Sequence, residues 1–148
     1  MDTAQQWRRD NVGRLLHNAI DRFETRILEQ MAAAGHGRFS LSHVNITRNL
    51  DLDGTRATEL ARRAGITKQS MGELIHQLEV GGIIERTPDP TDRRAKLVAF
   101  TAQGRQWMHA FRQALEQAER EMESELGAEA LQSLKSSLAR YGAGRSNT

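Results

Sequence analysis

The chain has 148 residues, of which 38% are hydrophobic, and its formal net charge is +2 at pH 7. It contains no cysteine, which excludes disulfides, thiolate metal sites and thiol-based oxidation sensing. No apolar run approaches the ~18 residues of a membrane span, and the first residues lack the apolar segment of a signal peptide. We therefore expect one domain, or one protomer of a small oligomer, that works in the cytoplasm without a membrane partner.

Residues 1–35 predict one long helix. Apolar residues recur at helical spacing from Val12 to Met31, and the pattern stops at Gly35-His36-Gly37. A second helix is expected from about Ser40 to Leu50. The turn Asp51-Leu52-Asp53-Gly54 then leads into the next segment.

Residues 54–101 predict a helix, a turn, a second helix and a hairpin. Gly65 gives the first helix a sharp exit. The hydroxyl of Thr67 is placed to accept from the backbone N–H of Gln69 or Ser70, so we expect it to cap the second helix. This order of elements is typical of a DNA-binding module.

The second helix of this segment has two distinct faces. Its apolar residues form one stripe against a core: Met71, Leu74, Ile75 and Leu78. The opposite face and the N-terminal end carry Lys68, Gln69, Ser70, Gly72, Glu73 and His76. Gly72 costs about 1 kcal/mol in a helix interior, and core packing gives no reason for it on an exposed face. Its missing side chain lets a partner come close.

The hairpin contains both prolines of the chain. Pro88 and Pro90 would stiffen a loop from Thr87 to Arg94, between a strand that begins at Ile83-Ile84 and a returning strand over Ala95–Phe100. The basic residues are Arg93 and Arg94 at the tip, with Arg86 and Lys96 on the flanking strands. Guanidinium groups at such a tip suit the minor groove of DNA and the neighbouring phosphates.

The acidic residues leave alternatives open. Glu73 either accepts from a cytosine amino group or orients a neighbouring arginine. Asp92 is expected to hold the hairpin through an ion pair with Arg94 or with an arginine of the first helix of the motif. An acidic run follows at Glu116, Glu119, Glu121, Glu123 and Glu125. It is either a solvated face or a partner for the arginine-rich N-terminal helix of a second copy.

The C-terminal part predicts two more helices, separated at Gly127. The first, over residues 102–124, carries an apolar face of Trp107, Met108, Phe111, Leu115, Ala118 and Met122, and the second runs over 128–141. The apolar faces of these helices and of the N-terminal helix are too wide to be buried by the central module alone. A twofold dimer is the simplest partner, with Trp7 and Trp107 as packing anchors. A monomer that folds its termini together is the alternative.

The central segment resembles the MarR family of winged helix-turn-helix regulators. The residues that carry the resemblance are Glu59-Leu60-Ala61, Gly65 to Met71, Leu78-Glu79, Gly82 to Arg86, Pro88-Asp89-Pro90 with Asp92 and Arg94, and Leu97-Val98 before Thr101 and Gly104. The resemblance implies a mainly α fold with a small β wing. A winged helix-turn-helix module would span 38–104, and the helices of 1–35 and 105–148 would form a dimerisation body. Where the family usually has a capping hydroxyl this chain has Arg56, so we expect Thr55 to cap.

Motif and resemblance together predict a homodimeric transcriptional repressor that binds a pseudo-palindromic operator in double-stranded DNA. The candidate DNA contacts are Thr67, Lys68, Gln69, Ser70, Gly72, Glu73, His76, Arg86, Arg93, Arg94 and Lys96. A small aromatic ligand is expected to release the operator. Its candidate contacts are Phe23, Phe39, His43 and Trp107, although core packing explains these aromatic residues as well.

No enzyme motif is visible, so no catalytic residue, metal or cofactor is expected. The five histidines lack zinc-ligand spacing, and the chain has neither a nucleophile elbow nor a glycine-rich phosphate loop. Two other function classes remain. One is an architectural DNA-binding protein with flat affinity across sequences. The other is a winged-helix module used for protein contact.

Overall fold

The computed structural model describes residues 3–144, which form seven helices and one three-stranded sheet. The elements are α1 (Thr3–Asp10), α2 (Val12–Ala33), α3 (Leu41–Asn49), β1 (Thr55–Arg56), α4 (Ala57–Ala64), α5 (Lys68–Val80), β2 (Ile84–Asp89), β3 (Asp92–Phe100), α6 (Ala102–Leu126) and α7 (Ala128–Ala143). The expected fold class, mainly α with a small β wing, is confirmed.

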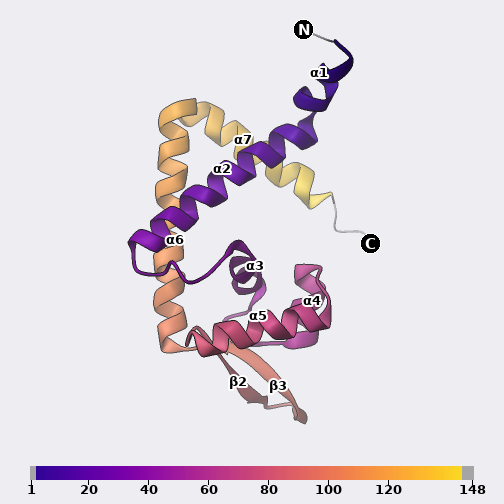
Figure 1. The fold of residues 1–148 in the computed structure, drawn as a ribbon, viewed down its shortest axis with the longest axis vertical. Helices are drawn as coiled ribbons and strands as arrows, with labels where there is room; N and C mark the ends of the chain where they lie inside the picture. The colour runs from indigo at the N-terminus through magenta and orange to yellow at the C-terminus, as the bar shows by residue number, and fades with distance from the viewer. Residues whose placement is uncertain (1–2, 145–148) are drawn as a thin grey trace.

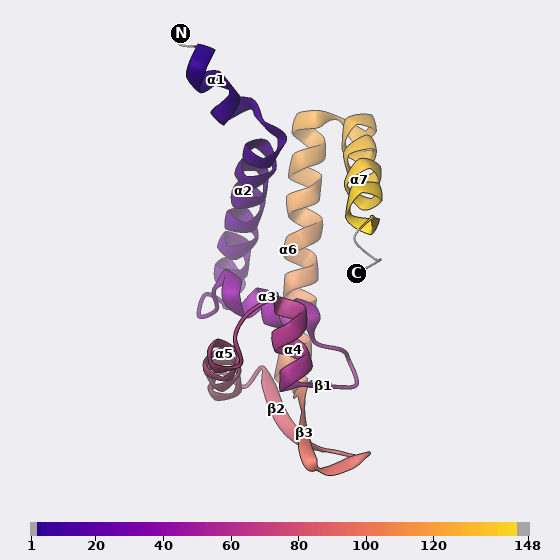
Figure 2. The ribbon, with the colours of Figure 1, turned by 90° about the vertical axis from the view of Figure 1, so that its right-hand side faces the viewer.

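The fold has two halves that share the long helix α6. The half drawn at the top of Figures 1 and 2 holds α1, α2, α7 and most of α6. The other half holds α3, α4 and α5, with the β2–β3 hairpin projecting from it. One hydrophobic cluster joins the halves, since it includes Ile27 and Met31 of α2, Ile75 of α5 and Trp107 of α6.

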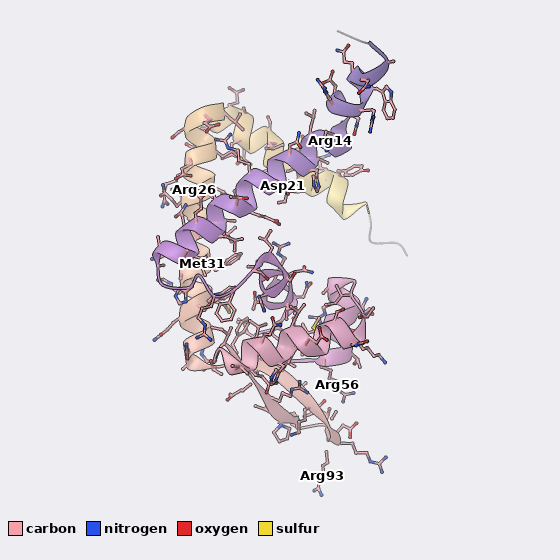
Figure 3. The ribbon with its side chains drawn as sticks, in the orientation of Figure 1. Arg14, Asp21, Arg26, Met31, Arg56 and Arg93 are labelled. Atoms are coloured by element: carbon pink, nitrogen blue, oxygen red, sulfur yellow. The ribbon has the colours of Figure 1, made fainter. Side chains whose placement is uncertain are left out.

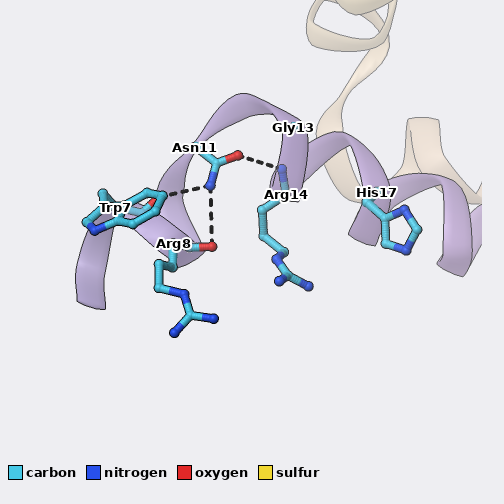
Figure 4. A pocket seen from close by; sticks show the side chains of 6 residues that line it. All are labelled: Trp7, Arg8, Asn11, Gly13, Arg14 and His17. Atoms are coloured by element: carbon cyan, nitrogen blue, oxygen red, sulfur yellow. Dashed lines mark hydrogen bonds between the residues drawn. The ribbon is translucent and has the colours of Figure 1, made fainter. Parts of the chain in front are cut away.

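The expectation of one long N-terminal helix is wrong, because the helix breaks at Asn11. Asn11 has extended backbone angles (φ −72°, ψ 151°), and its Oδ1 accepts from the N–H of Arg14 at 2.9 Å. Its Nδ2 donates to the carbonyl oxygen of Trp7 at 2.9 Å (Figure 4). Asparagine favours such caps over helix interiors because its side chain competes for backbone hydrogen bonds. As a result α1 points away from the body of the molecule (Figure 2).

The turn between α4 and α5 forms as the sequence predicts. Gly65 ends α4 with φ +69°, the left-handed region in which glycine is favoured. Thr67 is the N-cap of α5, and its Oγ1 accepts from the N–H of Ser70 at 3.1 Å. Met71 and Ile75 of α5 are at most 1% exposed, so the apolar stripe fixes which face of α5 looks outward.

The expectation that Thr55 caps α4 is wrong. The Oγ1 of Thr55 accepts instead from the N–H of Asp51 at 2.9 Å, and α4 begins after Arg56 without a side-chain cap. Thr55 lies in β1, which pairs antiparallel with β3 through Thr55↔Val98. Thr55 is therefore held in the β1–β3 ladder, with its hydroxyl bonded to Asp51, and does not cap α4.

Two residues of the acidic run of α6, Glu121 and Glu125, pair with α2 of the same chain. Arg26 donates to Glu121 through Nε and Nη2, both at 2.8 Å, and Arg22 pairs with Glu125. The hydrogen bond from Arg26 lowers the pKa of Glu121 to about 2. These pairs join the first and last thirds of the chain inside one copy.

Within residues 3–144 no helix is both long enough and apolar enough to cross a membrane.

Candidate nucleic-acid interface

The outward face of α5 is an unpartnered polar surface. Lys68, Gln69, Glu73 and His76 are exposed, and their side chains make no hydrogen bond or ion pair with another described residue. A Cβ added at Gly72 would meet nothing within 4 Å, so the glycine leaves open space at the middle of this face. Among the described residues Glu73 pairs with no arginine, so the structure does not support the alternative in which Glu73 orients an arginine of its own chain.

The N-terminal end of α5 adds two hydroxyl groups. The Oγ1 of Thr67 lies 3.0 Å from the Oγ of Ser70, and both residues are exposed. The first-turn N–H groups of a helix carry a partial positive charge, which favours contact with phosphate. This end of α5 therefore offers donors to an anion, next to the positive charge of Lys68.

The hairpin is longer and its turn is tighter than the sequence indicates. Only Pro90 and Thr91 lie outside the strands, whereas Pro88 lies in β2 opposite Lys96. The expected loop over residues 87–94 is therefore wrong. Pro88 is tolerated because β2 is an edge strand in the order β1-β3-β2, so its missing N–H disrupts no second ladder. Arg93 lies at the far end of the hairpin (Figure 3).

The basic residues of the hairpin differ in their surroundings. Arg93, Arg94 and Lys96 are exposed on β3, and their side chains form no ion pair among the described residues. Arg86 on β2 instead donates from Nε to Glu79 of α5 at 2.9 Å. Arg86 therefore braces the hairpin against α5, while the three residues of β3 are free to meet an anionic partner.

A buried carboxylate, Asp89, anchors the hairpin to the start of α4. Asp89 is 7% exposed, and its Oδ2 accepts from Arg56 Nε at 2.8 Å. Its Oδ1 accepts from the N–H and the Oγ1 of Thr91, both at 2.8 Å. The bonds from Thr91, followed by that from Arg56, lower the pKa of Asp89 to about 2.

Sequence reasoning assigned the anchoring role to Asp92 and missed Asp89. The Oδ2 of Asp92 is 3.9 Å from Arg56 Nη2, and its Oδ1 accepts from the N–H of Arg94 at 3.0 Å. The arginine that forms an ion pair with Asp92 is therefore Arg56, which precedes α4 and was not the expected partner, and Asp92 holds it less closely than Asp89 does. The order Asp-Pro-Thr at 89–91 is a turn signal that points to Asp89, whereas its pairing with Arg56 depends on the tertiary fold.

We predict that Asp89→Asn loosens the hairpin. The carboxylate of Asp89 stabilises the fold above its ordinary pKa of 3.8, and this stabilisation is lost as the pH falls toward about 2. The variant should therefore unfold at a lower temperature at neutral pH and lose less further stability between about pH 4 and about pH 2. Thermal unfolding followed by circular dichroism checks this, with Asp53→Asn in the exposed α3–β1 turn as the control. Equal curves for Asp89→Asn and wild type would contradict the assignment.

The four candidate ligand residues do not gather in one crevice. Phe39 packs edge-on against His43 and Trp107, with ring centroids 5.5 Å and 6.3 Å apart. Trp107 is 1% exposed, and its ring stacks on Phe111 of the same helix, so it is already packed within a single copy. Phe23 lies apart, in a hollow of about 500 Å³ between α2, α6 and α7. Phe39 and His43 line a separate hollow of about 420 Å³ beside α5.

These features define a winged helix-turn-helix protein: α4 and α5 joined by a capped turn, followed by an anchored β-hairpin. A model of the MarR family matches residues 20–95, slightly more than half of the chain. The chain belongs to the MarR family of transcriptional regulators. No curated protein sequence matches it significantly.

Solved structures share this fold over almost their whole length. A probable transcriptional regulator from Pseudomonas aeruginosa is 22% identical, with a TM-score of 0.71, covering 89% of this chain and 97% of that one. The transcriptional repressor CouR bound to a 23-mer DNA duplex is 22% identical, with a TM-score of 0.74 and coverage of 96% and 99%. CouR from Rhodococcus jostii RHA1 bound to p-coumaroyl-CoA is 21% identical, with a TM-score of 0.69 and coverage of 87% and 90%.

Proposed function

We propose that the protein is a homodimeric transcriptional repressor that binds a pseudo-palindromic DNA site. The observation that carries this proposal is the unpartnered polar face of α5, with open space at Gly72, beside the free basic residues of β3. A helix face whose side chains have no partner within the protein is available to hydrogen-bond the base edges in the major groove. The free arginines suit phosphate and the minor groove. CouR, which has this fold, was solved bound to DNA.

The proposed contacts fall into two groups. Gln69, Glu73 and His76 would meet base edges, with Gly72 allowing close approach of the backbone. Thr67, Lys68 and Ser70 would meet phosphate at the N-terminal end of α5. Arg93, Arg94 and Lys96 would follow the backbone and the minor groove from the hairpin. Arg86 would contribute by holding the hairpin against α5.

The proposed dimer interface is the half of the molecule that holds α1, α2 and α7. Large apolar side chains there are exposed in a single copy: Trp7, Val12, Leu15, Leu16 and Ile20 on α1 and α2, and Leu134, Leu138 and Tyr141 on α7. Large exposed apolar surfaces on soluble proteins mark sites of interaction. A second copy with twofold symmetry would cover it through the same helices. Residues 1–35 and 105–148 would then form the dimerisation body, and residues 38–104 the DNA-binding module.

We predict the spacing of the two half-sites. In a twofold dimer the two copies of α5 enter successive major grooves on one side of the duplex, so the half-site centres should lie about 10 base pairs apart. The test is to select duplexes from a random-sequence library with the full-length protein and to footprint the enriched site on both strands. An asymmetric footprint, or half-sites separated by half a helical turn, would overturn this docking arrangement.

An architectural role is the second candidate, favoured by the arginines of the hairpin, which can bind any sequence through phosphate. Selection separates the two functions. An architectural protein would enrich no sequence and would bind unrelated duplexes with similar affinity. A module that contacts only proteins would bind none of them. The proposed repressor should bind its selected duplex on the order of 1,000-fold more tightly than a scrambled one.

We infer that a small aromatic, anionic ligand releases the DNA. A ligand shifts an equilibrium only by binding one state better than the other, and the 420 Å³ hollow beside α5 would give it direct access to that helix. Arg38 supplies a cation at this hollow, and Phe39 supplies an aromatic edge. CouR, with the same fold, was solved with p-coumaroyl-CoA. A panel of aromatic acids tested by thermal shift and by release of the selected duplex checks this. If no acid changes either signal, the switch is absent.

A further inference from the structure

The start of α3 contains a histidine in a position that normally holds Glu or Gln. Ser40 is the N-cap of α3, and His43 stands three residues later, as the second member of a capping box. The Nδ1 of His43 accepts from the backbone N–H of Ser40 at 3.0 Å, and the Ser40 Oγ is also 3.0 Å from Nδ1. A ring nitrogen that accepts from an N–H carries no proton.

The other ring nitrogen of His43 reaches the proposed DNA-reading helix. Its Nε2 lies 2.7 Å from Oε1 of Gln77 on α5, so Nε2–H donates to this amide. Both bonds hold only for the neutral ring with its proton on Nε2. His43 therefore joins the N-terminal end of α3 to α5, one residue away from the exposed His76.

Packing makes this junction tight. His43 is 8% exposed, and Phe39 stands edge-on to its ring. Phe39 in turn presses on the C-terminal end of α5, where a Cβ added at Gly81 would lie 2.7 Å from its Cζ. Trp107 of α6 closes the cluster from the other side. A change at His43 thus reaches α5 through Gln77 and through Phe39.

We propose that His43 is a positioning residue that holds α5 in its DNA-binding orientation only while its imidazole is neutral. DNA binding should therefore weaken in acid. This inference rests on the DNA-binding function proposed above. A protonated ring presents an N–H at Nδ1, and the backbone N–H of Ser40 cannot turn into an acceptor for it. The hydrogen bond from the backbone N–H of Ser40 would be lost, and the ring would have to turn so that Nδ1–H donates to the Ser40 Oγ, now 3.0 Å away. This turn would move Nε2 relative to Oε1 of Gln77.

The groups that surround His43 come from the α2–α3 segment, α5 and α6. The hollow beside it is lined by Arg38 from the α2–α3 segment and by His76 and Gln77 from α5. α6 presents the uncharged Trp107 through Phe39. Among the described residues that line this hollow there is no carboxylate to offset an imidazolium. Arg38 and His76 are therefore the charged and titratable groups that share this hollow with His43.

His76 must be separated from this effect. Its exposed ring lies on the proposed DNA face, and a positive charge there strengthens the general attraction to the anionic duplex. The two histidines therefore oppose each other: acid strengthens binding through His76 and weakens it through His43. The informative comparison is between His76→Gln and the double variant His43→Gln/His76→Gln. Glutamine at position 43 offers an uncharged acceptor and donor in place of the two ring nitrogens.

The experiment measures affinity for the selected duplex from about pH 8 to about pH 5, where imidazoles ordinarily change charge. His76→Gln should weaken about fivefold across this range, the factor that corresponds to one lost hydrogen bond, and the double variant should change less than about twofold. His43→Ala/His76→Gln should bind DNA more weakly than the double glutamine variant at every pH. Glutamine at position 43 would then restore binding that alanine at this position loses. Equal pH profiles for His76→Gln and the double glutamine variant would overturn the proposal.

A second readout does not depend on DNA. Imidazole nitrogen NMR spectra of the full chain should show the His43 proton on Nε2 at neutral pH. Thermal unfolding should lose more stability on acidification in wild type than in His43→Gln. If the protein bound no duplex at all, the proposed function would fail while these two results stood. A His43 proton on Nδ1, or identical unfolding profiles, would refute the positioning role itself.

Discussion

Replacing Leu138 by glutamate should convert the protein into a monomer and weaken its DNA binding by about 100-fold or more. Leu138 lies on α7 and is 45% exposed in a single copy, next to Leu134 and Tyr141 on the same face. In the proposed dimer that face would be buried, so a buried carboxylate would oppose association. A monomer would hold one half-site at a time and lose the gain from joint binding. Sedimentation and fluorescence anisotropy with the selected duplex measure the two effects.

The matched control places the same charge on the other side of α7. Ser136 is exposed and lies away from the Leu134–Leu138 face, so Ser136→Glu should remain a dimer and bind DNA as wild type does. Circular dichroism at several protein concentrations tells whether the Leu138→Glu monomer keeps its fold. A Leu138→Glu protein that sediments as a dimer with unchanged DNA affinity would remove α7 from the interface.

The second large effect separates the contacts of the hairpin from those of α5. Arg94→Ala should weaken binding strongly on every duplex and reduce the salt slope by about one, since Arg94 is expected to meet phosphate and the minor groove. Gln69→Ala should instead relax sequence preference by about 1–3 kcal/mol at one position of the site. Binding titrations at several salt concentrations, on the selected duplex and on its single-base variants, measure both quantities.

Two controls make this comparison specific. Arg120→Ala removes the same charge from α6, and Gln113→Ala removes the same amide from an exposed position of α6. Both should leave affinity, salt slope and base preference close to those of wild type. If Arg94→Ala and Gln69→Ala lost affinity uniformly over all sequences, the division between backbone contact and base contact would be wrong.

The parts of the fold that the sequence predicted correctly are those set by local signals. Gly65 and Thr67 are a helix exit and a cap whose chemistry acts within a few residues. The face of α5 follows from the spacing of Met71, Ile75 and Leu78, because burial of that stripe leaves one orientation. The candidate residues Gln69, Glu73 and His76 were placed correctly on the exposed face for the same reason.

The parts that the sequence did not predict depend on contacts between distant segments. Asp89 pairs with Arg56 across 33 positions. Thr55 lies in β1, which pairs with the distant β3, and its Oγ1 accepts from the N–H of Asp51 instead of capping α4. Asn11 is a nearer case, in which a side-chain cap begins a new helix just before the apolar repeat that starts at Val12. Phe23 and Phe39 were expected to line one ligand site, but Phe23 lies on α2 and lines a different hollow from the one that Phe39 lines.

The most direct test of the central claim is sequence-specific DNA binding by the full-length protein at a stated salt concentration. Affinity is measured for the duplex enriched from a random library and for a scrambled duplex of equal length and composition. The proposed repressor should prefer the enriched duplex by on the order of 1,000-fold, with one dimer bound for each duplex. Similar affinities for both duplexes, or no binding to either, would contradict it.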